Sequence, residues 1–333
     1  MKKMKTQKSN PIAVLISDIH FTLGTLELAS SALSTALQDA KARKLSLVIC
    51  GDTLDAKAII RAEIANRLIN LLSNPDNPKI YLIVGNHDMC NEKGKEHALN
   101  FLQPYCDIVS HAKEVVLGEQ SVWLFPYFSD REEFARYIQH PHCSDLVIGH
   151  QGVLGGNPGH YIQDPGAIDP EILRGKRFIT GHYHAHQVEE NYSYVGTPYT
   201  ITFGEANDPP KGYCLLNSDG SLTHVPLNLR KHIIVERTTE TLAQPIINYV
   251  PGDLLWFKLT GSRMELDQVE RENVAKALGI SEGFKFDKIC TDSNVVRIDQ
   301  KVSLSNTQML DKIIDTSLVD DPEAVKSLYR ELM

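Results

Sequence analysis

The segment IAVLISDIH, residues 12–20, opens on five apolar residues and closes on Asp18 and His20. A short continuous apolar run is typical of a strand that is buried on both faces, as in layered α/β proteins. The pattern recurs in LSLVICGD (45–52), IYLIVGNHD (80–88), DLVIGHQG (145–152) and RFITGHYH (177–184). We therefore expect a core assembled from short buried strands.

Helical patterns separate the first three of these strands. ELASSALSTALQDAKAR (27–43) and AKAIIRAEIANRLINLL (56–72) repeat apolar residues at the spacing of an amphipathic helix. Strands and helices that alternate in this way predict parallel pairing in a layered α/β fold, with mixed sheets flanked by helices. EVVLGEQSVWLFPY (114–127) and GYCLLNSDGSLTHVPL (212–227) each predict a hairpin, because turn residues interrupt two strand-like runs.

The pattern changes near Leu229, which suggests further parts of the chain. We expect a basic tail over residues 1–11, the α/β domain over 12–230, a small α+β domain over 231–305 and short helices over 306–333. Within the small domain, VPGDLLWFKLTG (250–261) predicts a strand and ELDQVERENVAKAL (265–278) predicts one amphipathic helix.

Composition limits the classes of function. A formal charge of −8 argues against a protein that coats nucleic acid through bulk positive charge, but it allows a phosphate site whose positive charge comes from bound metal ions. The six cysteines form no C-x-x-C pair and are typical of thiols in a reducing compartment. The apolar run after the basic N-terminus is too short for a signal peptide or a membrane span. We expect a cytoplasmic protein, from a bacterium or a phage-infected host, with no membrane association.

Polar residues follow every one of the five apolar runs. Taken singly, Asp52 could be a turn residue or a helix cap, and His150 could be an ordinary surface histidine. Together they predict a site, because ligands of open α/β sheets bind at the carboxyl ends of strands. The set offers nitrogen and oxygen donors without a thiolate, which suits two divalent metal ions. The candidate ligands are Asp18, His20, Asp52, Asn86, His150, His182 and His184.

The segment FITGHYHAHQ (178–187) places His182, His184 and His186 at alternate positions. In a strand such residues share a face and lie about 6.5–7 Å apart, whereas paired catalytic ions lie about 3.5–4 Å apart. His182 and His184 could then serve one ion each, with a carboxylate such as Asp52 between the ions. On this geometry His186 would be a bystander.

The third run ends in Asn86, His87 and Asp88. If Asn86 points into the site, the side chain of His87 diverges from it and is free to protonate a leaving group. Asp88 could orient and charge that imidazole. Two metal ions beside such an acid predict hydrolysis of a phosphoester.

The motifs D-x-H, G-D, G-N-H-D, G-H and G-H-x-H occur in the order found in calcineurin-like metallophosphoesterases, which the chain resembles over residues 12 to about 228. YVGTPYTITFGEANDPPKGYCLL (194–216) further resembles the SbcD nuclease family, above all its T-even phage branch. The resemblance implies a metallophosphoesterase sandwich and a role for His87 at the transition state. It implies one metal ion held by Asp18, His20, Asp52 and His184, and a second held by Asp52, Asn86, His150 and His182.

The resemblance also implies an activity and partners. Members of the SbcD family are DNA nucleases of repair and recombination, acting as exonucleases on DNA ends and as endonucleases on hairpins. They use manganese, with magnesium as the alternative. We accordingly expect DNA, an SbcC-like ATPase of the SMC family and a second copy of the chain as partners. Residues 231–305 would form a DNA-facing capping domain, and the last helices could contact the ATPase. The role of Asp55 stays open.

Two other functions are consistent with parts of the sequence. A phosphodiesterase of the same fold that acts on small substrates, such as cyclic nucleotides, is favoured by the lack of a strong basic stripe. A non-catalytic scaffold for the ATPase is less consistent, because all the expected ligand types are present. A phosphoprotein phosphatase fits poorly, since Ala56 and Lys57 follow Asp55 and Asp88 replaces a glutamate of that branch.

Overall fold

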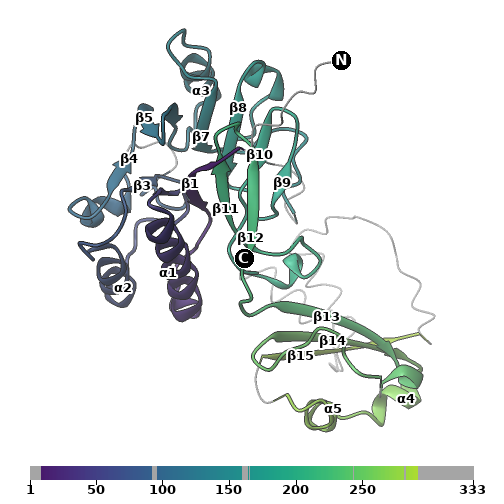
Figure 1. Cartoon of the computed structure of the whole chain (residues 1–333). Helices are drawn as coiled ribbons and strands as arrows, with labels where there is room; N and C mark the ends of the chain where they lie inside the picture. The colour runs from purple at the N-terminus through teal and green to yellow at the C-terminus, as the bar shows by residue number, and fades with distance from the viewer. Residues whose placement is uncertain are drawn as a thin grey trace, which may run out of the picture. The chain divides into compact units, whose positions relative to one another are not determined.

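The computed structural model describes residues 9–91, 96–159, 164, 166–242, 244–280 and 283–291. Two six-stranded sheets and a smaller three-stranded sheet make up the described chain (Figure 1). The predicted helices over 306–333, the end of the predicted capping domain and most of the basic tail lie outside the described residues.

The first sheet has the spatial order β12–β11–β1–β2–β3–β4. Its strands are β1 (Pro11–Ile16), β2 (Ser46–Ile49), β3 (Ile80–Ile83), β4 (Asp107–Val109), β11 (Gly212–Asn217) and β12 (Leu222–Pro226). β1 to β4 pair in parallel and β11 joins β1 in the antiparallel sense, so the sheet is mixed. β11 and β12 form the predicted hairpin.

The second sheet has the order β5–β6–β7–β8–β10–β9. Its strands are β5 (Lys113–Leu117), β6 (Gln120–Leu124), β7 (Leu146–His150), β8 (Arg177–Gly181), β9 (Gln187–Val188) and β10 (Tyr192–Tyr194). β5 and β6 form the other predicted hairpin, while β6, β7 and β8 pair in parallel. Both sheets therefore contain parallel neighbours whose carboxyl ends share one edge.

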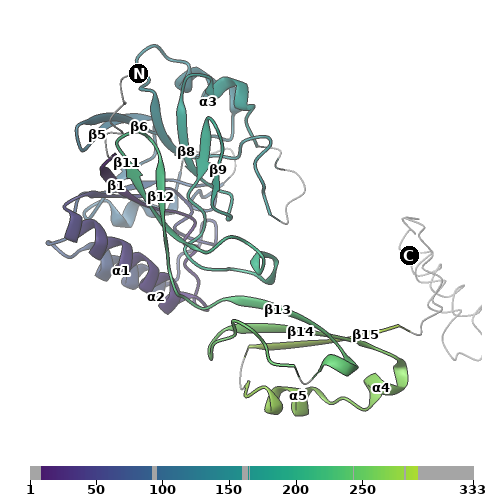
Figure 2. The ribbon, with the colours of Figure 1, turned by 45° about the vertical axis from the view of Figure 1, so that its right-hand side comes forward.

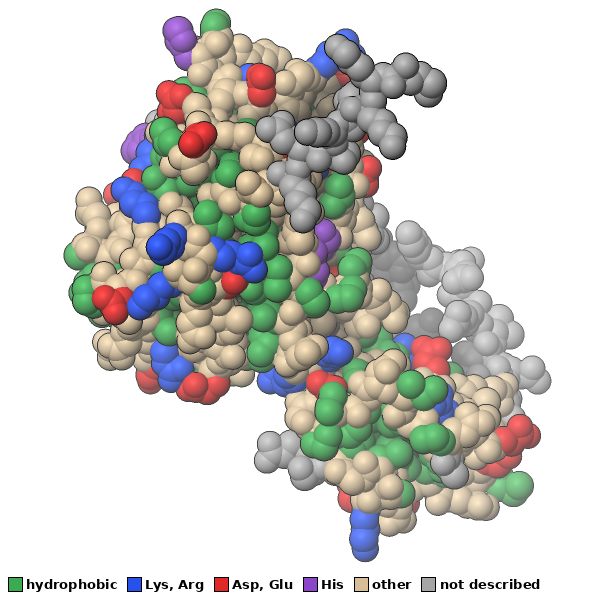
Figure 3. All heavy atoms as spheres, in the orientation of Figure 1, with side chains coloured by type: hydrophobic (Ala, Val, Ile, Leu, Met, Phe, Trp, Pro, Cys, Tyr) green, Lys and Arg blue, Asp and Glu red, His purple; other side chains and the backbone are tan. Residues whose placement is uncertain are grey.

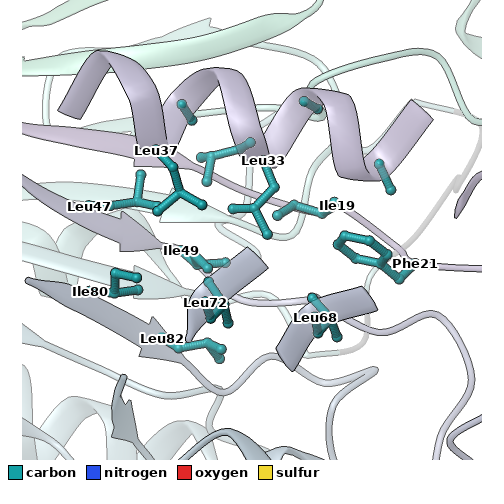
Figure 4. Packing of buried hydrophobic residues seen from close by; sticks show 14 of the residues in the cluster. Ile19, Phe21, Leu33, Leu37, Leu47, Ile49, Leu68, Leu72, Ile80 and Leu82 are labelled. Carbon is teal, nitrogen blue, oxygen red and sulfur yellow. The ribbon is translucent and has the colours of Figure 1, made fainter. Parts of the chain in front are cut away.

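Alternate residues of β1 pack in different layers of the core. Ala13 and Leu15 belong to a cluster shared by the two sheets, whereas Val14 and Ile16 face the helices α1 (Leu26–Arg43) and α2 (Ala62–Leu72). Figure 4 shows Leu33 and Leu37 of α1 above the strand residues Leu47 and Ile49. A strand that is buried on both faces has to be apolar throughout, which explains the continuous run at residues 12–16.

The outer face of the second sheet is covered by α3 (Arg131–Ile138) and the 3₁₀ helix η2 (Pro170–Leu173). Phe134 of α3 packs there against Phe178 of β8. The remaining 3₁₀ helices are η1 (Ala98–Leu102), η3 (Phe203–Glu205) and η4 (Thr239–Thr241). Helices thus flank two mixed sheets, and the predicted layered α/β sandwich is confirmed.

A three-stranded sheet follows, made of β13 (His232–Thr238), β14 (Leu254–Gly261) and β15 (Phe284–Cys290), with β14 in the middle. Two short helices, α4 (Arg263–Asp267) and α5 (Arg271–Ala277), lie on one side of it (Figure 2). The prediction of one continuous helix over 265–278 was wrong. Glu270 is extended, with φ −91° and ψ 137°, and is the N-cap residue of a new helix; Leu266 of α4 and Val274 of α5 are both buried.

The second predicted helix also differs, since α2 begins at Ala62 rather than near residue 56. Ala58 has a left-handed backbone, with φ 61°, and residues 55–61 form a loop beside the site described below. In the parts of the chain that the structure describes, no helix is long and apolar enough to cross a membrane. The small sheet belongs to the same compact unit as the sandwich, and a domain boundary at 230/231 stays a prediction.

Candidate active site

The predicted ligands gather at one edge of the sandwich. Asp18 and His20 follow β1, Asp52 follows β2 and Asn86 follows β3, while His150 ends β7 and His182 and His184 follow β8. The first three strands belong to one sheet and the last two to the other, so both sheets contribute. The edge holds a cavity of about 390 Å³. Its lining residues are His20, Asp52, Asp55, Asn86, His87, Pro158, Asp164, His182, Tyr183, His184, Ile201 and Thr202.

The donor atoms of the predicted ligands fall into two groups, and a third group joins His20 to Asp55 and His87. In each of the sets Asp18–His20–His184 and Asp52–His150–His182, the three donor atoms lie within 4.8 Å of one another. Asn86 joins the second set, since its Oδ1 lies 3.0 Å from His150 Nε2 and 2.9 Å from His182 Nδ1. Asp52 lies between the sets, with Oδ2 3.2 Å from His150 Nε2 and 3.8 Å from His20 Nε2. The resemblance implies that each group holds one ion, and this assignment stays a prediction.

The backbone at these positions is unusual. Asp18, His20 and Asp52 have φ values of 50°, 48° and 48°, and His182 has φ 93°. Non-glycine residues rarely adopt this left-handed conformation, which costs about 1–3 kcal/mol each where the surroundings impose it. Such residues cluster at functional sites because they aim side chains that regular strands would direct elsewhere.

Glycines precede four of the seven predicted ligands, Asp52, Asn86, His150 and His182, for a steric reason. A Cβ atom on Gly85 would lie within 3.0 Å of the Asp52 carboxylate, and one on Gly51 would lie as close to the His150 ring. At Gly181 it would meet Ser17 Oγ and His150 Nδ1 within the same distance. The glycine of each G-D, G-N and G-H motif therefore leaves room for a group from a neighbouring strand. The motifs are spatially interlocked.

The electrostatics of the site favour a cation. His20 is 4% exposed, and neither of its ring nitrogens makes a hydrogen bond, although Nδ1 lies 3.3 Å from Asp55 Oδ1. Burial opposes protonation of His20, but Asp55 and the charges of Asp52 and Asp18 outweigh it and raise the pKa. Likewise burial is outweighed at His150, where Asp52 raises the pKa to about 9. The negative charge of these buried carboxylates favours protons on the imidazoles, and metal ions could balance that charge equally well. The residues present therefore fit divalent cations.

Three of the four candidate histidine ligands have a hydrogen-bond acceptor at one ring nitrogen, His20 being the exception. His150 Nδ1 lies 2.8 Å from the Cys50 carbonyl oxygen, His182 Nε2 lies 3.1 Å from Asp164 Oδ2, and His184 Nδ1 lies 2.8 Å from Glu205 Oε1. Metal-binding histidines usually have such partners, which set the tautomer and the ring orientation. Burial raises the pKa of Glu205, but the hydrogen bond to His184 and the charge of Lys211 lower it to about 2.

Sequence reasoning missed Asp164 and Glu205. Glu205 stands in the F-G-E step of the 194–216 segment, so a signal for it existed, but its partner could not be read from the sequence. Asp164 follows no strand and offers no such signal.

His87 lines the cavity, with its Nδ1 2.8 Å from the backbone oxygen of Asp55. The sequence predicts that Asp88 orients this ring, but in the structure the Asp88 carboxylate binds backbone N–H groups instead. Asp88 is fully buried and accepts hydrogen bonds from the backbone N–H groups of Gly85 (2.9 Å), Leu54 (2.9 Å) and Thr53 (3.3 Å). Adjacent side chains diverge, and this carboxylate ties the loop after β3 to the loop after β2.

The segment that carries His182, His184 and His186 does not continue β8 as a strand. β8 ends at Gly181, and the left-handed His182 begins an irregular segment, so alternate-strand spacing does not explain why His182 and His184 both reach the site. The ring of His186 bonds to the Tyr194 oxygen through Nδ1 at 2.8 Å and stacks on His224. Among the described residues His186 belongs to neither donor set.

Comparison with known proteins agrees with this geometry. The family model of calcineurin-like phosphoesterases matches residues 13–186, the stretch that carries all five motifs. The chain belongs to the calcineurin-like phosphoesterase family. Membership confirms the suspected family and the predicted enzyme class, a metal-dependent hydrolase of phosphoesters.

One relative of this phosphoesterase is the protein named exonuclease subunit 1 of Enterobacteria phage T4. The two chains are 25% identical over 194 residues, which cover 55% of this chain and 56% of the phage protein. The match thus spans little more than half the length of that relative.

Proposed function

We propose that this calcineurin-like phosphoesterase is a DNA nuclease that depends on two divalent metal ions. One observation carries the proposal. Asp52 belongs to one set of donors and lies 3.8 Å from His20 of the other, and both sets contribute residues to the cavity that His87 also lines. This is the arrangement that a two-metal hydrolase of phosphoesters requires.

The proposed ligands are Asp18, His20, Asp52 and His184 for one ion, and Asp52, Asn86, His150 and His182 for the other. Bound ions would supply Lewis-acid stabilisation of the phosphate and activation of water. The mixture of imidazole nitrogens and oxygens suits manganese better than magnesium, which prefers oxygen ligands alone.

The chain itself supplies orientation and a proton. Asp18 accepts the backbone N–H of His182 at 3.0 Å and the hydroxyl of Ser17 at 2.5 Å, so its carboxylate is fixed. A carbonyl oxygen can only accept, so the contact between His87 and Asp55 places a proton on His87 Nδ1. In its charged form His87 then carries a second proton on Nε2, which we propose it donates to the leaving oxygen.

Nuclease activity is supported by the relative's name, exonuclease subunit 1, and DNA as the substrate rests on the resemblance of the 194–216 segment to the SbcD family. The basic residues on the surface do not by themselves indicate a DNA-binding site, because several of them pair with acidic residues. Lys41 pairs with Asp76, Arg43 with Asp39 and Arg174 with Glu171. On the face drawn in Figure 3, lysine and arginine side chains lie among acidic ones. We propose that contacts near the cavity and a partner, rather than a basic stripe, hold the DNA.

The word subunit in the relative's name supports an assembly. We propose an SbcC-like ATPase of the SMC family as the partner, a second copy of the chain, and a function in DNA repair or recombination. Residues 231–305 would then cap the nuclease domain of residues 12–230 on the DNA side, with 306–333 towards the ATPase.

A small-substrate phosphodiesterase is the second candidate. A cavity of about 390 Å³ has the size of many small-ligand sites, and the formal charge of −8 suits a substrate smaller than DNA.

The test uses the full chain with linear DNA, hairpin DNA and cyclic nucleotides, each with and without Mn²⁺, alone and with the candidate ATPase. We expect DNA cleavage that requires the metal and falls about 10²- to 10⁴-fold in His87→Ala, which loses its acid. The exposed Glu171→Gln variant is the control. Hydrolysis of cyclic nucleotides alone would favour the second candidate, and DNA cleavage that persists under chelation would exclude the two-metal mechanism.

A further inference from the structure

The segment 194–216 drew attention in the sequence, yet none of its residues belongs to the proposed metal ligands. In the structure it surrounds His184. The backbone oxygen of His184 accepts hydrogen bonds from Thr197 N (3.0 Å), Thr197 Oγ1 (3.2 Å) and Lys211 Nζ (2.8 Å). A Cβ on Gly196 would lie 3.0 Å from the same oxygen, so the turn at this glycine packs directly on the chain of His184.

The side chain of His184 is held by the same segment. Its Nδ1 lies 2.8 Å from Glu205 Oε1. Glu205, beside the ammonium of Lys211, is an ionised carboxylate and can only accept, so the proton of this bond sits on His184 Nδ1. The other oxygen of Glu205 accepts the backbone N–H of Ile201 at 3.0 Å and lies 3.3 Å from Lys211 Nζ.

Glu205 and Lys211 are each 8% exposed, and Lys211 also pairs with Asp208 at 2.8 Å. A buried carboxylate and a buried ammonium carry a desolvation penalty, which their mutual attraction and hydrogen bonds offset. Among the described residues, neither Glu205 nor Lys211 belongs to a donor set with Asp18 or His20. Their common contact is His184, at both its ring and its backbone.

We propose that Glu205 is a positioning residue for His184. It fixes the tautomer protonated on Nδ1, turns the Nε2 lone pair towards Asp18 and His20, and thereby sets the affinity of that donor set for a divalent cation. Lys211 keeps Glu205 in place and anchors the His184 backbone. The inference rests on the proposed function, because it requires that the donor set binds metal.

The test measures Mn²⁺ binding to the metal-free full chain by calorimetry. Wild type should bind two ions. Glu205→Gln keeps the shape but removes the charge, and should weaken one of the two sites about 10- to 100-fold, the usual effect of losing such a partner. The second site should keep its affinity. Glu171→Gln, which removes an exposed carboxylate in an ion pair with Arg174, should leave both sites unchanged.

A spectroscopic measurement separates positioning from general damage. Long-range ¹H–¹⁵N correlations of the metal-free protein report which ring nitrogen of each histidine carries the proton. His184 should be protonated on Nδ1 in wild type and should become a mixture of tautomers in Glu205→Gln. Lys211→Met, which leaves the carboxylate in place, should weaken the same site by a smaller factor and serves if Glu205→Gln does not fold.

The outcomes are distinguishable. Mn²⁺ affinities of Glu205→Gln that are unchanged from wild type at both sites, or an Nε2 proton on His184 in wild type, would overturn the positioning role and leave the proposed nuclease intact. Wild type that binds no Mn²⁺ would instead remove the proposed function itself.

Discussion

Replacing Asp88 by alanine tests whether this residue ties two loops together or acts on His87. The carboxylate is fully buried and accepts the N–H groups of Gly85 and Leu54, both at 2.9 Å, and more weakly that of Thr53. A buried donor that loses its partner costs about 1–3 kcal/mol. Two well-formed bonds therefore predict a loss of about 2–6 kcal/mol in the free energy of unfolding. Asp88→Asn keeps one acceptor oxygen and should lie between this variant and wild type.

The assay is urea unfolding of the metal-free protein, followed by circular dichroism. Asp76→Ala is the matched control, because it removes a carboxylate that is 73% exposed and pairs with Lys41 on the surface. That surface change should cost no more than about 0.5 kcal/mol. If the free energy of unfolding of Asp88→Ala lies within about 1 kcal/mol of the wild-type value, the role of Asp88 in tying the two loops together is refuted. A shift in the titration of His87 without a loss of stability would restore the role that the sequence suggested.

Three further outcomes follow from individual contacts. Gly181→Ala should destabilise the chain by about 1–3 kcal/mol, since its Cβ would collide with Ser17 and His150. Denaturation would measure the loss of stability, and Mn²⁺ titration would measure the effect on metal binding. His186→Ala should still bind two Mn²⁺ ions in calorimetry. Loss of either ion would show that His186 is a metal ligand in addition to His182 and His184. Burial, with His186 stacked beside it, lowers the pKa of His224 to about 4, so the folded state favours neutral His224. Stability should be full above the unfolded pKa of about 6.5 and fall as the pH drops towards 4. His224→Gln should reduce that acid sensitivity in unfolding measured across this range.

Much of the architecture was predictable because local patterns carry it. The buried strands β1, β2, β3, β7 and β8 correspond to the five apolar runs, and both hairpins were recognised from their turns. The break at Glu270 and the start of α2 were not predicted, because apolar spacing continues across residues whose backbone is not helical. Glu270 and Ala58 carry no local signal that would break a helix.

The sequence by itself determined which residue types stand at the strand ends, and strand topology then made their meeting foreseeable. Only the tertiary structure decided where each side chain points. The Asp88 carboxylate binds backbone N–H groups. His182 points into the site because its own backbone is left-handed, not because it lies on one face of a strand. Glu205 reaches His184 from 21 positions away in the chain. Hydrogen-bond partners and tautomers depend on contacts between segments far apart in sequence, which no local pattern encodes.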